Sequence, residues 1–231
     1  MKYDEWIDGM FNREQLNQFD LDWDEDWIQK LYSLSSNEIL GLIAETFAKA
    51  GKDLRHFSDI QVALGLNCIT NECREWLYWI YNDDASTSEQ LAVINNIYVL
   101  YRDCLALRCS NDPAAESTTP LDIYAVMFGD ASALCIYRVL KSNINDKEEL
   151  IDAILSVWEN TLKIANATCQ RAAIHALGHE QFKVRQFHPG YERRAELLRH
   201  IDNTIDRYCD LSTTHEKLKE YALQARTGMI Q

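Results

Sequence analysis

Helix-start signals recur along this chain, and they constrain its fold more than any other feature. Ser35 and Glu38 stand three residues apart, directly before an apolar pattern of helical period. The same spacing recurs at 58–61 and 86–89. In such a capping box each of the two side chains bonds to the backbone N–H of the other residue, which starts a helix. These signals predict that helices dominate the structure.

Glycine and proline are scarce, which argues against a strand-rich fold. The 231 residues include 8 glycines and 3 prolines, and a β protein of this length usually needs more turn residues. The pattern predicts an all-α protein of roughly nine or ten mostly antiparallel helices. The expected helices cover a short segment at 23–31, then 35–51, 58–81, 86–109, 121–128, 131–141, 145 or 146 to 162, a segment from 166 or 168, 191–208, and a last segment from 213 or 214.

The chain shows no stretch that resembles a linker between two cores. We expect an acidic, aromatic N-terminal helical segment at 1–34 and a single helical-repeat-like domain at 35–231. The clearest loop within that domain is 110–120, with the sequence SNDPAAESTTP.

Charge and cysteine usage limit the compartment and the partners. The seven cysteines include no CxxC pair, and no apolar stretch of signal-peptide length follows Met1. We therefore expect reduced, mostly buried cysteines in a cytoplasmic protein, with no membrane contact. The formal net charge is −13. Proteins that bind nucleic acid directly usually carry the opposite balance, so a basic protein is the favoured partner.

The first 30 residues carry nearly half of that net charge, with nine acidic and three basic residues. Aromatic side chains interleave with the acids in the stretch FDLDWDEDW. One interpretation is a short helix that buries residues 23, 27 and 31. The other is a partner-binding surface, in which acids speed encounter and aromatic anchors slow release. The predicted partner-binding residues are Asp20, Asp22, Trp23, Asp24, Glu25, Asp26 and Trp27.

His175 and His179 are the strongest candidates for metal chemistry. Residues at i and i+4 share one helix face, so the two imidazoles could chelate a transition metal. A catalytic zincin would have Glu at position 176, where this chain has Ala. Cys169 and His188 are possible third ligands. The alternative is a pair of packing histidines, each satisfied by a hydrogen bond. Because two ligands define no complete site, we expect no cofactor and no resident metal.

Other catalytic motifs are missing from the sequence. There is no GxSxG, no P-loop and no GxGxxG, so we expect a protein that is not an enzyme. Residues 171–200 carry six basic and three acidic side chains. These basic side chains could bind an acidic group of a partner, or they could pair with the acidic N-terminal segment of the same molecule.

The stretch AAIHALG at 172–178 resembles the second-helix pattern of HEAT and armadillo repeats. In those repeats small residues let one helix lie close to its neighbour, and here Cys169, Ala172, Ala173 and Ala176 would form the small face. The resemblance implies a single curved array of helix pairs. The pattern Ala-x-His-x-Leu-Gly-His is also similar to uncharacterised bacterial helical proteins, from which no activity carries over.

A small, acidic, helical chain without a catalytic motif resembles bacterial toxin-immunity proteins, which bind and block a toxin. That resemblance implies a non-enzymatic protein that binds and neutralises a basic toxin or effector. The alternative function is that of a metal-dependent enzyme centred on His175 and His179.

Overall fold

The computed structural model describes residues 1–12, 25–70, 77–82, 84–114, 119–132, 134–187 and 190–227. Within these ranges the chain is helical and contains no strand, and helix accounts for 77% of the described residues. The predicted all-α class is confirmed.

The helices have the following bounds. They are α1 (Tyr3–Phe11), α2 (Glu25–Tyr32), α3 (Ser36–Asp53), α4 (Asp59–Thr70), the 3-10 turn η1 (Leu77–Tyr81), α5 (Thr87–Leu100), the π-helical turn η2 (Tyr101–Leu105), α6 (Ala106–Arg108), α7 (Pro120–Ala131), α8 (Ile136–Lys141), α9 (Lys147–Thr161), α10 (Ala167–Phe187), α11 (Arg194–Asp210) and α12 (Glu216–Arg226). Helices α5, η2 and α6 run on without a break.

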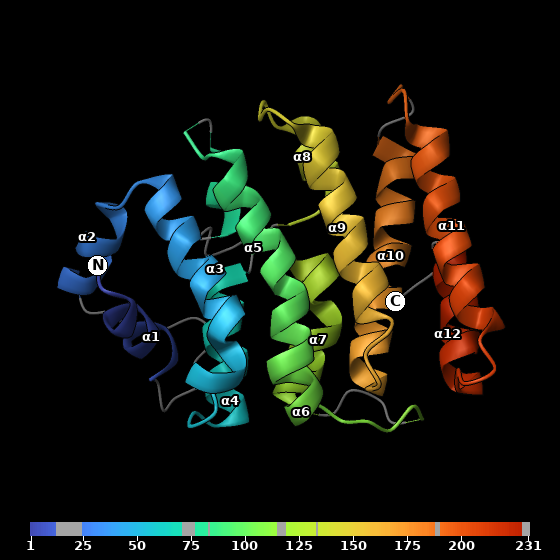
Figure 1. Ribbon diagram of the computed structural model, residues 1–231, viewed down its shortest axis with the longest axis horizontal. Coiled ribbons are helices and arrows are strands. Elements are labelled where there is room, and N and C mark those ends of the chain that lie inside the picture. The colour runs from blue at the N-terminus through green and yellow to red at the C-terminus, as the bar shows by residue number, and fades with distance from the viewer. Residues whose placement is uncertain are drawn as a thin grey trace.

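The longer helices lie side by side in two layers (Figure 1). Helices α3, α5, α9 and α11 face the viewer in Figure 1, and α4, α7, α10 and α12 lie behind them. In the rear layer α7 packs on α4 and α10, and α10 also packs on α12. The chain therefore progresses along the long axis from α1 and α2 at one end to α11 and α12 at the other.

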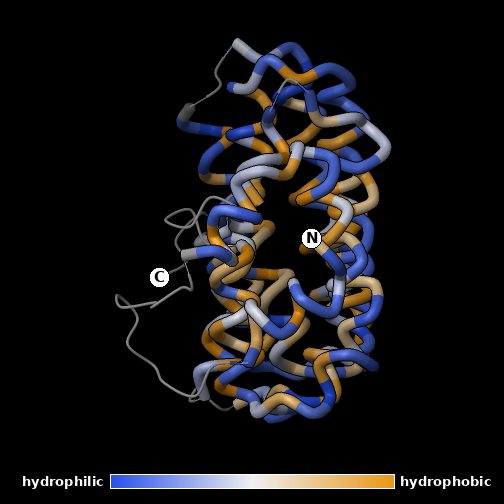
Figure 2. Tube along the Cα trace, turned by 90° about the vertical axis from the view of Figure 1, so that its left-hand side faces the viewer, coloured by the Kyte–Doolittle hydropathy of each residue, from blue (hydrophilic) through white to orange (hydrophobic). Residues whose placement is uncertain are grey.

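Buried apolar side chains hold the two layers together. They form one contiguous cluster that reaches from Trp6 in α1 to Ala225 in α12. Figure 2 looks onto the N-terminal end of the array and shows the two layers next to each other. Trp27 and Leu31 of α2 belong to this cluster, so the N-terminal helices share the core of the rest of the chain.

Two of the three predicted capping boxes are complete, and the third is formed by one of its two bonds. The Ser35 hydroxyl accepts from the backbone N–H of Glu38, and the Glu38 carboxylate accepts from the backbone N–H of Ser35. Ser58 and Gln61 make the same reciprocal pair at the start of α4. At the start of α5 the Ser86 hydroxyl accepts a hydrogen bond from the backbone N–H of Glu89. These local signals place the starts of α3, α4 and α5 correctly.

Gly51 is the last residue of the helix expected at 35–51, and it does not end that helix. Helix α3 continues to Asp53, with Gly51 inside its last turns. A Cβ at Gly51 would lie 2.5 Å from the backbone oxygen of Asp103. Glycine is therefore needed for the close approach of α3 to the π-helical turn.

Other predicted boundaries also shift. Helix α4 is described as far as Thr70, and the expected helix to 81 is wrong at Leu77–Tyr81, which form a 3-10 turn. The last helix begins at Glu216, after the expected start at 213 or 214, and His215 is its N-cap. Helix boundaries depend partly on tertiary contacts, so the local sequence places them only to within a few residues.

Five of the described cysteines are buried, and Cys209 is half-buried. Burial raises the pKa of Cys104 to about 11 and those of Cys135 and Cys169 to about 12, so these thiols stay protonated. In the part of the chain that the structure describes, no helix has both the length and the apolar character to cross a membrane.

Candidate functional site

Helix α10 carries the predicted histidine pair and lies against α7. The side chain of Asn166 accepts from the backbone N–H of Cys169 at 3.0 Å and caps the start of α10. Contact with α7 is unusually close, because a Cβ at Gly129 would lie 2.3 Å from the Cβ of Ala176. Small residues therefore bring the end of α7 close to His175 and His179.

Asp130, near the end of α7, is the partner that this approach brings to the histidines. Its Oδ1 lies 3.2 Å from Nδ1 of His179 and 3.1 Å from Nζ of Lys183. One ligand-type atom from each of Asp130, His175 and His179 lies within 4.8 Å of the other two. Asp130 carries no local signal in the sequence, because it lies 45 positions before His175 and no motif marks it.

His175 is buried, with 2% of its surface exposed. Its Nδ1 lies 2.7 Å from the hydroxyl oxygen of Tyr221 in α12. Its Nε2 is buried and has no hydrogen-bond partner among the described residues. Burial, together with the neighbouring His179, lowers the pKa of His175 to about 4. The imidazole is therefore neutral near pH 7, with one ring nitrogen left unsatisfied.

The other two candidate ligands are not part of this cluster. The Sγ of Cys169 lies 3.9 Å from the backbone oxygen of Tyr101, and Cys169 is not among the three residues whose ligand atoms lie within 4.8 Å of one another. His188 lies outside the described residues.

Glu180, the residue after the pair, supports the start of α8. It is 1% exposed, and both of its carboxylate oxygens accept from the backbone N–H of Ile136 at 3.1 Å. Burial raises the pKa of Glu180 to about 7. Its contacts make Glu180 a cap for α8, which has no side-chain cap of its own at Cys135.

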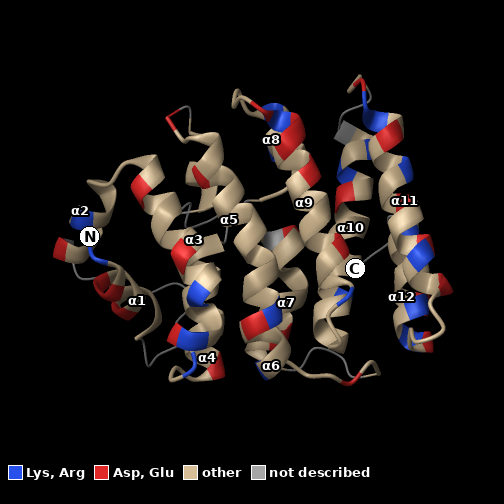
Figure 3. Cartoon of the chain, viewed as in Figure 1, with Lys and Arg blue, Asp and Glu red and all other residues tan. Residues whose placement is uncertain are grey.

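Lys183, Arg185 and Arg193, among the basic residues of 171–200, contact acidic side chains of nearby helices. Arg193 contacts Glu148 and lies 3.6 Å from Asp152, both in α9. Arg185 lies 3.8 Å from Asp202 in α11. Figure 3 shows basic and acidic residues interspersed over α9, α11 and α12. Among the described residues, these contacts replace the pairing with the N-terminal segment that the sequence left open.

Much of the predicted N-terminal binding surface lies outside the described residues, and one member of it is buried. Trp27 is 9% exposed and stacks on Trp6, with ring centroids 6.5 Å apart. The Trp27 indole N–H donates to the backbone oxygen of Glu5 at 3.3 Å. Trp27 is thus a core residue, as the helical interpretation expected, and Asp26 beside it is exposed. The members outside the described residues are Asp20, Asp22, Trp23 and Asp24, and nothing is described of the side chain of Glu25.

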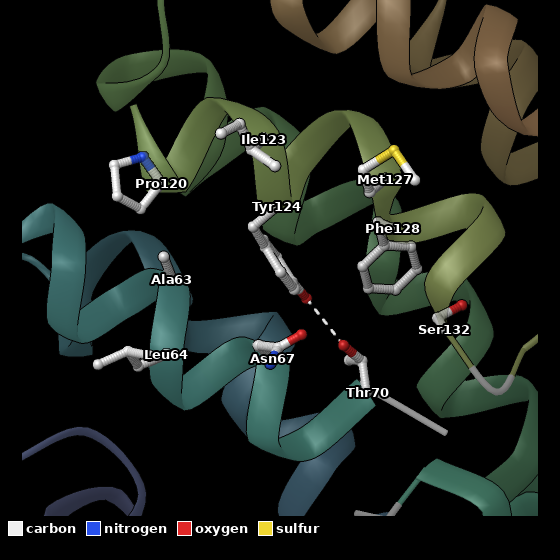
Figure 4. A pocket seen from close by; sticks show the side chains of 10 residues that line it. All are labelled: Ala63, Leu64, Asn67, Thr70, Pro120, Ile123, Tyr124, Met127, Phe128 and Ser132. Atoms are coloured by element: carbon white, nitrogen blue, oxygen red, sulfur yellow. Dashed lines mark hydrogen bonds between the residues drawn. The ribbon is translucent and has the colours of Figure 1, made fainter. Parts of the chain in front are cut away.

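An apolar groove lies between α4 and α7 in the rear layer. Its volume is about 320 Å³. Figure 4 shows its lining, with the hydroxyls of Thr70 and Tyr124 3.2 Å apart between the two helices. Ile123 stands on α7 at the groove and is 48% exposed. The lining residues are Ala63, Leu64, Asn67, Thr70, Pro120, Ile123, Tyr124, Met127, Phe128 and Ser132.

The groove and the histidine cluster lie next to each other. Ile123, Met127 and Asp130 have the spacing i, i+4 and i+7, so they share one face of α7. The first two line the groove, and the third contacts His179 and Lys183 on α10. One surface of the rear layer therefore combines an apolar depression with a polar cluster. No family model, curated protein or solved structure matches the chain.

Proposed function

We propose that this chain is a non-enzymatic protein-binding protein that binds and neutralises a basic toxin or effector, as bacterial immunity proteins do. The observation that carries the proposal is the apolar groove between α4 and α7. A groove of about 320 Å³ with the half-exposed Ile123 beside it can receive a large apolar side chain of a partner. Interfaces concentrate their binding energy in such central pockets.

The charge of the chain supports a basic partner. A net charge of −13 attracts positively charged proteins and raises the rate of encounter with them. The two-layer arrangement of α3 to α12 supports the resemblance to a degenerate HEAT-like array, because stacked helices offer an extended surface to a partner.

The test begins with the partner and ends with the groove. Proteins that co-purify with the chain from its native host are identified, and the candidate is produced separately. Binding is then measured by surface plasmon resonance for the natural chain, for Ile123→Asp and for the control Leu211→Asp. Leu211 is 53% exposed after the end of α11 and does not line the groove. Both substitutions place a charge at a solvent-exposed position, so both variants should fold.

We expect a basic partner whose Kd rises about tenfold or more with Ile123→Asp, because a carboxylate at the edge of the groove opposes burial of the partner's apolar side chain there. A tenfold rise in Kd corresponds to about 1.4 kcal/mol of binding free energy. Leu211→Asp should bind like the natural chain. The same partner should slow cell growth when produced alone and should not do so when produced with this chain. An acidic partner, or equal binding by both variants, would overturn the proposal.

The alternative function, a metal-dependent enzyme centred on His175 and His179, gains one favourable observation. Asp130 adds a carboxylate to the pair, and three protein ligands with a remaining open position are typical of catalytic metal sites. That function requires an ion at the cluster, which can be tested by itself.

A further inference from the structure

We infer that Asp130, His175 and His179 bind a divalent transition-metal ion of the zinc type. From the histidine pair alone we expected no resident metal, because two ligands define no complete site. The approach of α7 adds Asp130 as a third ligand and changes that expectation. The inference is independent of the proposed protein partner, since it concerns a different set of atoms.

The ligand chemistry matches this class of ion. Two imidazoles and one carboxylate are common ligands of Zn²⁺ and of Fe²⁺, Co²⁺ and Ni²⁺. With metal–ligand distances of about 2.0–2.2 Å, ligand atoms around one tetrahedral ion lie about 3.3 Å apart. Nδ1 of His179 and Oδ1 of Asp130 are already 3.2 Å apart. The whole set lies within 4.8 Å, so modest side-chain rotations would close the site.

The unsatisfied nitrogen of His175 is a second observation that points to a ligand. Buried nitrogen atoms in proteins nearly always have a hydrogen-bond partner, and Nε2 of His175 has none among the described residues. Its other ring nitrogen, Nδ1, lies 2.7 Å from the Tyr221 hydroxyl. Histidines that bind metals typically have their second nitrogen held in this way, which orients the ring. An ion at Nε2 would satisfy the remaining atom.

The site is accessible to solvent, and Lys183 competes with an ion for Asp130. Asp130 and His179 are 30% and 21% exposed at their side chains, so an ion can enter from solvent. Lys183 contacts the same carboxylate oxygen of Asp130 at 3.1 Å. The ammonium group of Lys183 balances the charge of Asp130, and a cation that binds Asp130 would have to displace it. Removing the charge of Lys183 should therefore strengthen metal binding.

The experiment uses the full chain without an affinity tag, after treatment with a chelator. Isothermal titration with ZnCl₂ gives the affinity and the number of ions. Titration with CoCl₂, followed by visible absorption, reports whether nitrogen and oxygen ligands surround the ion. The variants are Asp130→Asn, His179→Gln and Lys183→Met. The control is His200→Gln, which changes a histidine that lies 2.8 Å from the Glu159 carboxylate on another part of the surface.

We expect one ion per chain, with the affinity lowered more than tenfold in Asp130→Asn and His179→Gln. It should be unchanged in His200→Gln and higher in Lys183→Met. Circular dichroism checks that each variant is folded. The inference can be tested with any one of the three site variants that folds. Absence of binding by the natural chain, or equal affinity in His179→Gln and His200→Gln, would overturn the inference.

Discussion

The contact between Gly129 and Ala176 decides how closely α7 and α10 approach. A side chain at position 129 would meet the Cβ of Ala176 at 2.3 Å, its Cα at 2.9 Å and the ring of Trp158 at 3.3 Å. Backbone and a small rigid side chain cannot move aside as a flexible side chain can. The position of Asp130 beside the histidines therefore depends on the absence of one carbon atom at the preceding residue.

Substitution of Gly129 tests this dependence. We expect Gly129→Ala to lower the free energy of unfolding by about 1–3 kcal/mol, because the added methyl group overpacks the contact between the helices. Urea denaturation followed by circular dichroism measures the change.

The matched control is Gly41→Ala, in the interior of α3. There the nearest atom to a new Cβ is Oε2 of Glu89, at 3.8 Å. Alanine restricts the unfolded chain and favours helix, so this variant should gain about 0.5–1 kcal/mol. Changes of the same sign in both variants would contradict the packing argument.

At the scale of single helices, capping hydrogen bonds explain why so many start positions could be predicted. The reciprocal bonds of Ser35 and Glu38 join residues only three positions apart, so they form wherever the local chain turns into a helix. Asn166 caps α10 and Thr119 caps α7 by similar short-range bonds. Short stretches of the sequence therefore determine where these helices start.

Ser35→Ala is expected to destabilise the protein by about 1 kcal/mol, since it removes the acceptor for the Glu38 backbone N–H. Thermal unfolding by calorimetry should show a lower Tm. Ser156→Ala serves as the control, because Ser156 is exposed in the middle of α9 and caps no helix. That variant should be neutral or slightly more stable. If both serine variants lost equal stability, the loss could not be assigned to the cap.

For the whole molecule, the distribution of charge governs encounter with a partner. Five acidic residues lie between positions 20 and 26 of the N-terminal segment. One of them, Asp26, is exposed on α2. Charges of one sign on a surface raise the association rate with an oppositely charged protein, and salt screens the effect.

Replacing Asp20, Asp22, Asp24, Glu25 and Asp26 with Asn or Gln should lower the association rate with the basic partner and reduce its dependence on salt. Surface plasmon resonance at low and high salt measures both quantities. A control with the same change in net charge neutralises five exposed acids of the C-terminal half, namely Glu149, Glu192, Asp210, Glu216 and Glu220. An equal loss of rate in both variants would show that total charge matters and that the N-terminal acids have no special role.

The sequence by itself determined the helical class, the starts of several helices and the burial of Trp27 and Leu31 on one face of α2. These features follow from bonds and periodicities within a few residues, which the local sequence contains in full. The His175 and His179 pair was likewise visible, because its spacing lies within one helix.

Only the tertiary structure decided what surrounds that pair. Asp130 joins it from another helix, and Tyr221 reaches it from a third. These neighbours depend on how closely whole helices pack, which a contact such as that of Gly129 with Ala176 controls. The groove between α4 and α7 arises in the same way, from side chains more than 50 positions apart. Such long-range contacts have no local signature in the chain, so they appear only when the helices are assembled.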